Sequence, residues 1–385
     1  MFFLKLLIRN AFRHRLRTLL TIVGIAIAIL SFGMLRTVVA AWYAGVNASS
    51  ANRLITRNAI SLVFSLPTAY QERIRQVEGV KSVSYANWFG GVYINEKNFF
   101  PNFAIEPLSY LSMYPEFVIS ANELNDFARD RKACVVGSKL AQRYNWKIGD
   151  TITLKGTIFP GNWEFVLRGI YRGRDKSTDE GQFFFHWNYL NESMRKSFPR
   201  RADQVGIYLV EVKNPQQSAE VAQRVDALFK NSLAETLTET EKAFQLSFVS
   251  MTEAIVVAIR IVSYVVILII MAVTANTMSM TARERIGEYA IFKAMGFGTG
   301  HIAGMIFGES LCIAGIGCAI GMALTFPAAQ LFGDSLSQFF PVFLVERTTL
   351  ALDAAIAVLL GVTAGLFPAY RAATIRIADG LRRIG

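Results

Sequence analysis

Residues 261–282 read IVSYVVILIIMAVTANTMSMTA, a long run without a single charged side chain. A helix needs about 20 predominantly apolar residues to cross the hydrocarbon core of a bilayer. Two further uncharged apolar runs lie at residues 18–35 and 354–370, and a third, at residues 302–326, carries only Glu309. The sequence therefore predicts a multi-pass membrane protein with four transmembrane helices.

The four runs are split one-plus-three around a middle region of ordinary soluble character. The chain has 385 residues and is 52% hydrophobic, with a mean hydropathy of +0.33, and most of that apolar content lies toward its two ends. We expect a membrane α-helical protein with a large α+β extracytoplasmic domain on helical stalks. The predicted segments are a cytoplasmic basic amphipathic segment (1–17), transmembrane helix 1 (18–44), the extracytoplasmic domain with its stalk (45–250), transmembrane helix 2 (251–282), a cytoplasmic helix (283–300), transmembrane helix 3 (301–326), a short external loop (327–350), transmembrane helix 4 (351–370) and a cytoplasmic tail (371–385).

Positive charge is concentrated beside the membrane runs. The formal net charge is +11, and basic residues placed next to spans mark cytoplasmic ends. The flanking residues are Lys5, Arg9, Arg13, Arg15 and Arg17 before the first run, and Arg371, Arg376, Arg382 and Arg383 after the last. Both termini are therefore expected in the cytoplasm, and a nucleic-acid partner is not expected. A cleaved signal peptide is the alternative for the first run, but its apolar stretch is longer than the usual 7–15 residues or so.

The middle region has the pattern of a mixed domain. Alternating strands follow turn signals, as at Gly149-Asp150 before Thr151-Ile-Thr-Leu, while residues 71–77 have helical spacing. From Glu220 to Arg260 there are almost no turn residues, so a long stalk helix running into the second span is expected. The aromatic stretch Phe183-Phe-Phe-His-Trp187 is either a ligand surface or a buried strand, and we favour the strand because aromatic residues suit sheet cores.

No motif of a catalytic or metal site is found. The chain has no complete phosphate-binding loop, no zinc-protease motif and no nucleophile elbow, and its three cysteines fit buried thiols. We expect no catalytic residue, no metal and no ATP hydrolysis by this chain itself. Three charges lie in or beside spans. Arg36 and Arg260 are interpreted as snorkelling side chains, and Glu309 as a carboxylate that reaches the cytoplasmic interface.

Small residues recur four apart in the spans. Such pairs allow helix backbones to approach closely where lipid supplies no hydrophobic drive. The candidate helix-packing residues are Gly24 with Ala28, Gly304 with Gly308, Gly317 with Gly321, and Gly361 with Gly365. They indicate a tightly packed bundle or contacts with a second copy.

Three separated segments resemble one family. They are Arg9-Asn-Ala-Phe-Arg-His-Arg-Leu-Arg-Thr-Leu-Leu-Thr-Ile-Val-Gly-Ile near the start, Glu284-Arg-Ile-Gly-Glu-Tyr-Ala-Ile-Phe-Lys-Ala-Met-Gly296 between the second and third runs, and Pro368-Ala-Tyr-Arg-Ala-Ala-Thr-Ile-Arg-Ile-Ala-Asp-Gly-Leu-Arg382 at the end. The chain resembles the MacB/FtsX-like ABC transporter permeases. Two stretches of the middle region, Val135-Val-Gly-Ser-Lys-Leu-Ala and Lys147-Ile-Gly-Asp-Thr-Ile, are similar to that family's periplasmic core domain.

The resemblance implies a permease subunit without a fused ATPase domain. Two copies of a separate ABC-type ATPase would bind ATP and Mg, and their closure would be passed through the spans to the outer domain. The resemblance also implies a homodimer or heterodimer of permeases in the bacterial cytoplasmic (inner) membrane, with a periplasmic adaptor or outer-membrane protein as a further partner. The substrate does not follow from it.

The resemblance places the ATPase contact on the segment after the second span, which makes it a coupling helix. The residues it assigns to this contact are Glu284, Arg285, Glu288, Tyr289, Phe292, Lys293 and Gly296. Glu284 and Glu288 would lie one turn apart on one face, while Tyr289 and Phe292 would enter a groove of the partner. An ordinary interfacial helix is the alternative.

Three functions remain open. The favoured one is export or extraction of a substrate on the outer side of the membrane. The second is an FtsX-like regulator that activates an extracytoplasmic partner such as a cell-wall hydrolase. The third is a membrane receptor with no ATPase, for which substitution of Glu288 or Gly296 would leave function unchanged.

Overall fold

The computed structural model describes residues 15–336, 340 and 342–374. Parts of the predicted basic segment (1–14), external loop (337–339 and 341) and cytoplasmic tail (375–385) lie outside the described residues. The chain divides into two compact units, one made of residues 1–41, 253–335 and 343–385, and the other of residues 42–252 and 336–342. Each unit is described by itself.

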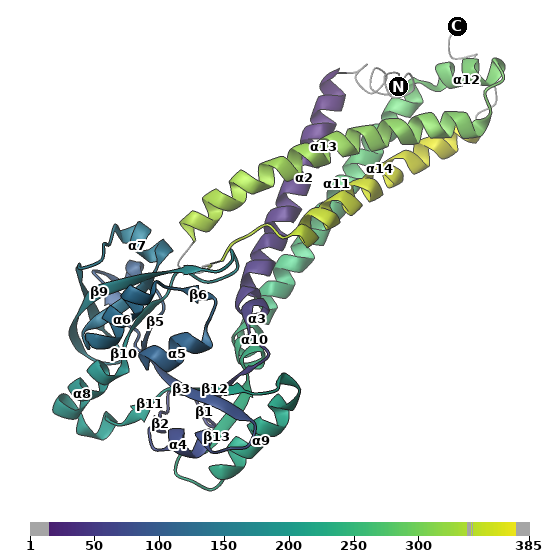
Figure 1. Ribbon diagram of the computed structural model, residues 1–385. Coiled ribbons are helices and arrows are strands. Elements are labelled where there is room, and N and C mark those ends of the chain that lie inside the picture. Colours follow the sequence, from purple (N-terminus) through teal and green to yellow (C-terminus); the bar gives the residue numbers. More distant parts are fainter. Residues whose placement is uncertain (1–14, 337–339, 341, 375–385) are drawn as a thin grey trace. The chain divides into compact units, whose positions relative to one another are not determined.

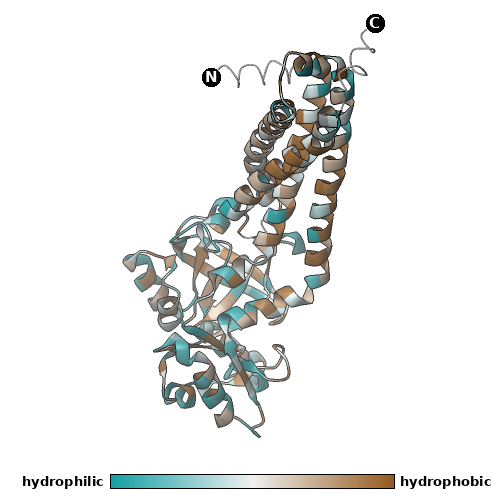
Figure 2. Ribbon diagram, turned by 90° about the vertical axis from the view of Figure 1, so that its right-hand side faces the viewer, coloured by the Kyte–Doolittle hydropathy of each residue, from teal (hydrophilic) through white to brown (hydrophobic). Residues whose placement is uncertain are grey.

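The first unit is a bundle of long helices (Figure 1). Its helices are α2 (Arg15–Trp42), α11 (Glu253–Glu284), α12 (Ile286–Ala294), α13 (Thr299–Ser335) and α14 (Arg347–Thr374). All of these except the short α12 are long and apolar enough to cross a membrane. A helix is suited to the lipid interior because it satisfies its backbone hydrogen bonds internally. Figure 2 shows hydrophobic residues along these helices. Among the described residues, the four predicted runs thus form four candidate membrane helices.

Helix α13 continues past Phe326, where the third span is predicted to end, and reaches Ser335. Pro327 lies inside the helix, and a membrane helix tolerates proline when neighbouring groups satisfy the freed carbonyl. The predicted external loop is therefore partly helical. At one end of the bundle the start of α2 meets the end of α11 through the Arg17–Glu284 ion pair. The short α12 meets the end of α14 there through the packing of Tyr289 with Ala369 and Ala372. The cytoplasmic assignment of this end stays a prediction.

Several of the small residues lie at close helix crossings. An added Cβ at Gly317 would lie 2.7 Å from Ile25 Cγ2, and one at Gly321 would lie 2.7 Å from the Ala26 carbonyl oxygen. Helix α13 thus approaches α2 at both positions. Helix α14 approaches α13 in the same way, with Gly361 against Leu311 and Gly365 against Phe307. At Gly24 the added atom would meet only Ile270 at 3.3 Å, and at Gly304 it would meet nothing within 4 Å. Ala28 is buried and Gly308 is half-buried.

We expect Gly321→Ile to destabilise the bundle, because its side chain would have to displace the α2 backbone. Overpacking of this kind costs about 1–3 kcal/mol, measurable as a lower midpoint of thermal unfolding in detergent. The control is Gly304→Ile, which changes the same residue type on the same helix where the structure leaves open space. Equal midpoints for the two variants would contradict a close α2–α13 crossing.

The second unit is a mixed domain, so the predicted α+β composition of the middle region is confirmed. Its helices are α3 (Ala44–Ala48), α4 (Tyr70–Arg75), α5 (Pro107–Met113), α6 (Ala121–Arg129), α7 (Ser138–Tyr144), α8 (Trp187–Ser197), α9 (Ser218–Leu228) and α10 (Glu241–Met251). Its strands are β1 (Arg53–Asn58), β2 (Leu66–Pro67), β3 (Val80–Trp88), β4 (Val92–Tyr93), β5 (Asn102–Ile105), β6 (Phe117–Val118), β7 (Ala133–Gly137), β8 (Thr151–Gly156), β9 (Gly161–Gly173), β10 (Phe183–His186), β11 (Gln204–Val205), β12 (Ile207–Val212) and β13 (Thr236–Thr240).

The main sheet has the strand order β13-β1-β12-β3-β5-β10-β7-β9-β8-β4, with β6 paired to β9 and a separate β2–β11 pair. Most pairs are antiparallel, but β10 is parallel to β5 and β7 is parallel to β9. Strand β10 is the predicted aromatic strand, and its burial is confirmed. Phe183 and Phe185 enter one hydrophobic core and Phe184 enters the other, because successive side chains of a strand point to opposite faces.

The expected single helix from Glu220 to Arg260 is wrong. Helix α9 ends at Leu228, β13 follows, and α10 and α11 are separate helices that break at Thr252. Asn231 has a positive φ of 60°, and the Thr residues of β13 favour a strand because β-branched side chains suit a pleated surface. Strand β13 pairs with β1 along its length, so this part of the chain is an edge of the sheet.

The chain enters and leaves the domain through a buried ionic cluster. Arg53 at the start of β1 donates through Nε to Glu241 Oε2 at 2.8 Å and through Nη2 to Glu116 Oε1 at 2.7 Å. Its Nη1 donates to the Met113 carbonyl at 2.8 Å. Glu241, the first residue of α10, also accepts from the Tyr114 hydroxyl at 3.0 Å. The cluster therefore joins the first strand, the last helix and the α5–β6 turn.

Candidate functional site

The predicted coupling segment forms a short helix with a defined start and end. Helix α11 stops at Glu284, Arg285 has a non-helical ψ of 10°, and α12 begins at Ile286. At the other end, Phe297 N–H donates to the Phe292 carbonyl and Gly296 N–H to the Lys293 carbonyl, both at 3.0 Å. This is the Schellman pattern. Gly296 takes φ 93°, which glycine adopts without steric cost, and Phe292 and Phe297 pack 5.7 Å apart between ring centroids.

Arg285 is a buried charge that links the segment to the third long helix. Its Nη1 donates to Glu309 Oε2 at 2.7 Å and its Nε to Glu288 Oε2 at 3.0 Å. The Arg285 side chain is 6% exposed and that of Glu309 is 10% exposed. A buried guanidinium requires such partners, because an unpaired charge in the interior is very costly. Glu309 is the functional candidate whose partner sequence reasoning missed, although it is the only charge in the third apolar run.

Glu284 links the same segment to the first long helix. Arg17 of α2 donates to both of its carboxylate oxygens, at 2.7 and 2.9 Å. This two-bond geometry fixes the orientation of both side chains. The predicted pair Glu284 and Glu288 is divided by the break at Arg285. Glu284 accepts from Arg17 of α2, whereas Glu288 accepts from Arg285 itself. The segment is thus tied to α2 through one ion pair and to α13 through another.

The two predicted apolar contact residues pack inward. Tyr289 is buried in a cluster with Ile302 and Ile306 of α13 and with Ala369 and Ala372 of α14, and Phe292 is partly buried against it. Burial raises the pKa of Tyr289 to about 12, so its hydroxyl stays neutral at physiological pH. Lys293 is half-buried and Gly296 is exposed. A role for Tyr289 and Phe292 in partner contact stays a prediction.

The exposed apolar residues of the segment are different ones. Ile291, Met295 and Phe297 are all exposed, and they lie on the last turn of α12 and directly after it. Large apolar side chains gathered on one exposed face mark interaction sites. Sequence reasoning missed this face, because the rotation of a short helix about its own axis is set by its neighbours.

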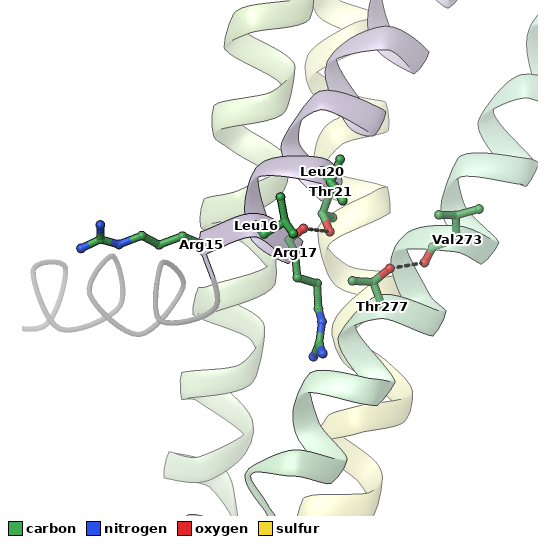
Figure 3. A pocket seen from close by; sticks show the side chains of 7 residues that line it. All are labelled: Arg15, Leu16, Arg17, Leu20, Thr21, Val273 and Thr277. Carbon is green, nitrogen blue, oxygen red and sulfur yellow. Dashed lines mark hydrogen bonds between the residues drawn. The ribbon is translucent and has the colours of Figure 1, made fainter.

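A groove of about 590 Å³ opens between α2 and α11 beside the Arg17–Glu284 pair (Figure 3). Leu16, Leu20 and Val273 contribute its apolar lining. The hydroxyls of Thr21 and Thr277 donate to carbonyls of their own helices, both at 2.9 Å. The charged side chains of Arg15 and Arg17 complete the lining. Within the described ranges no three His, Cys, Asp or Glu side chains are placed to hold a metal ion.

Two ion pairs and one apolar cluster join the segment around Arg285 to the long helices. Glu284, at the end of α11, pairs with Arg17 of α2, and Arg285, just before α12, pairs with Glu309 of α13. The apolar cluster around Tyr289 connects α12 itself to α13 and α14.

Two family descriptions match the chain. The MacB-like periplasmic core domain matches residues 18–228, and the FtsX-like permease C-terminal region matches residues 260–377. An uncharacterised ABC transporter permease of Methanocaldococcus jannaschii is 24% identical over 401 residues, covering 97% of this chain and 96% of the relative. The macrolide export ATP-binding/permease protein MacB of Nitrobacter winogradskyi is 32% identical over 109 residues, which is 28% of this chain and 16% of that protein.

Two solved structures are similar at low identity. The periplasmic region of MacB from Actinobacillus actinomycetemcomitans has a TM-score of 0.38 at 9% identity, covering 53% of this chain and 95% of that one. The extracellular domain of the ABC-type transporter YknZ from Gram-positive bacteria has a TM-score of 0.37 at 12% identity, covering 49% of this chain and all of that one.

Proposed function

The chain belongs to the MacB-like periplasmic core domain family and is an ABC transporter permease of the MacB/FtsX type, and we propose that it couples ATP hydrolysis by a separate subunit to movement of its extracytoplasmic domain. Two ATPase copies would bind ATP and Mg, and two permease chains in the cytoplasmic membrane would receive their closure. The moving domain would export or extract a substrate on the outer side.

The observation that carries the proposal is the pair of ionic links on one short segment. The Arg17–Glu284 pair joins the end of α11 to α2, the helix before the large domain. The Arg285–Glu309 pair joins the residue just before α12 to α13, a helix of the three-span set. A segment that only lay at the membrane surface would need neither link. The exposed residues Ile291, Met295 and Phe297 supply the apolar contact that a partner subunit would bury.

The first test is whether an ABC-type ATPase binds through this face. We expect the tagged chain, purified from its native membrane in mild detergent, to retain an ATPase that peptide mass spectrometry identifies. The double variant Ile291→Asp/Met295→Asp should lose it, because burying two carboxylates in an apolar contact costs more than the contact returns.

The control is Ile60→Asp, which adds the same charge at an exposed isoleucine in the other unit, and it should keep the ATPase. The docking proposal would be overturned if no ATPase is found with the native chain, or if the double variant keeps it.

A second measurement distinguishes export of a substrate from regulation of a partner. Substrate loss from vesicles containing the complex supports export, whereas ATP-dependent activation of a wall hydrolase without substrate loss would support a regulator.

A further inference from the structure

A buried carboxylate in the helical unit has no visible partner. Asp353, on the second turn of α14, is 0% exposed, and neither of its carboxylate oxygens has a hydrogen-bond partner among the described residues. The nearby Cys318 thiol approaches only the backbone carbonyl of Asp353, at 3.6 Å. Buried polar groups are almost always paired, so this exception requires an explanation.

Two hydroxyl groups near Asp353 donate to other acceptors. An added Cβ at Gly33 of α2 would lie 3.3 Å from Asp353 Oδ2 and 3.1 Å from Thr325 Oγ1 of α13, so three helices meet at this carboxylate. The Thr325 hydroxyl donates to the Gly321 carbonyl at 2.9 Å. The Thr37 hydroxyl, one turn along α2, donates to the Gly33 carbonyl at 2.7 Å. Each hydroxyl thus donates to a backbone carbonyl of its own helix and not to Asp353.

A second buried polar atom without a partner lies within one turn of Gly33. Arg36 is three residues after Gly33 on α2, and positions three apart lie on the same side of a helix. Its Nε is buried and also lacks a hydrogen-bond partner among the described residues. A guanidinium is always charged and presents its donors in a fork that suits a carboxylate. Arg36 and Asp353 therefore carry opposite charges on helices that contact each other. Each side chain has at least one buried polar atom without a hydrogen-bond partner, and the two side chains form no ion pair with each other.

We infer that Arg36 and Asp353 are the two halves of an ion pair that forms in a second arrangement of the spans. The described structure is the arrangement in which they are apart. A shift of α2 against α14 brings the Arg36 guanidinium to the Asp353 carboxylate and gives both groups a partner. This inference rests on the proposed function, because movement of the first span is what coupling to the ATPase requires. Asp353 and Arg36 then act as positioning residues that stabilise the second arrangement of the spans.

The test is a double-mutant cycle on the native complex with its bound ATPase. Arg36→Gln and Asp353→Asn should each lower ATP-dependent transport or signalling activity about tenfold, within the usual range of coupling energies. The double variant should be no worse than either single one, because both remove the same interaction. Exchange of the charges, Arg36→Asp with Asp353→Arg, should restore part of the activity. The control is Arg260→Gln on α11, an exposed charge, which should change nothing.

Thermal unfolding of the purified chain without nucleotide gives an independent measurement. Because the two side chains are apart in the described arrangement, the two single substitutions should change the unfolding midpoint additively. Non-additive midpoints would mean a permanent structural pair and would overturn the inference, as would additive losses of activity. If the proposed function itself is wrong, no ATPase will be found bound to the native chain. That result differs from every outcome of the double-mutant cycle.

Discussion

Glu309→Ala is expected to abolish ATP-dependent activity and to lower the stability of the helical unit. Removal of this carboxylate leaves the Arg285 guanidinium buried with Glu288 as its remaining ionic partner. Breaking a buried ion pair by deleting one partner costs about 3–5 kcal/mol. The midpoint of thermal unfolding in detergent should fall well below that of the native chain, and the bound ATPase should no longer respond to the permease.

A second variant separates folding from coupling. In Arg285→Met/Glu309→Leu, two apolar side chains of similar size replace the buried pair, and such replacements are often neutral or stabilising. We expect near-native unfolding but still no coupled activity, since apolar contact is non-directional and no longer fixes α12 against α13. If this variant is stable and fully active, the ion pair does not transmit motion.

The control for both is Glu192→Ala in the other unit. Its partner is Arg131, and the two side chains are 49% and 67% exposed. An exposed pair contributes at most about 1 kcal/mol, so neither stability nor activity should change measurably. A loss comparable to that of Glu309→Ala would show that the assay does not distinguish buried pairs from exposed ones.

The sequence predicts the long helices of this protein well because their signal is local. An uncharged run such as residues 261–282 is long enough to span a membrane whatever surrounds it. The buried strand Phe183–His186 is similar, since its aromatic composition alone favours a sheet core. Both features were predicted from composition without knowledge of any distant contact.

The contacts of the candidate site depend on residues far apart in the chain, and sequence reasoning missed them for that reason. Glu309 lies 24 residues from Arg285, and nothing in the spacing predicts that the two helices turn these side chains toward each other. Tyr289 packs inward for the same reason. The break before β13 did have a local signal, because Asn231 tolerates a positive φ and the alternating Thr236, Thr238 and Thr240 suit a strand.

Arg53→Ala is expected to loosen the point where the chain enters and leaves the large domain. Arg53 is 5% exposed and holds Glu241, which is 8% exposed, together with Glu116. Its guanidinium also lies 4.1 Å above the Tyr114 ring. Burial raises the pKa of Tyr114 well above its ordinary value, so its hydroxyl stays a neutral donor to Glu241. Without Arg53 the Glu241 carboxylate would be buried with neutral donors alone, at a cost of about 3–5 kcal/mol.

Hydrogen–deuterium exchange of the full chain measures this effect locally. Amides of β1 and α10 should lose protection in Arg53→Ala, because opening of that region becomes easier, while amides of the β7–β9 pair should not change. The matched control is Arg57→Ala on the same strand. Arg57 pairs with Glu239 at 3.0 Å, and both side chains are more exposed, at 18% and 20%.

A loss of about 1 kcal/mol or less is expected for the control, as for other partly exposed pairs. Equal loss of protection in the two variants would mean that burial of the Arg53 cluster adds nothing to its strength. If the larger effect is confined to the Arg53 variant, the buried cluster holds β1 and α10 rigidly together, so that the two elements move as one. Coupled activity should then fall in Arg53→Ala and persist in Arg57→Ala, because only the first variant lets the two segments at the base of the domain move independently.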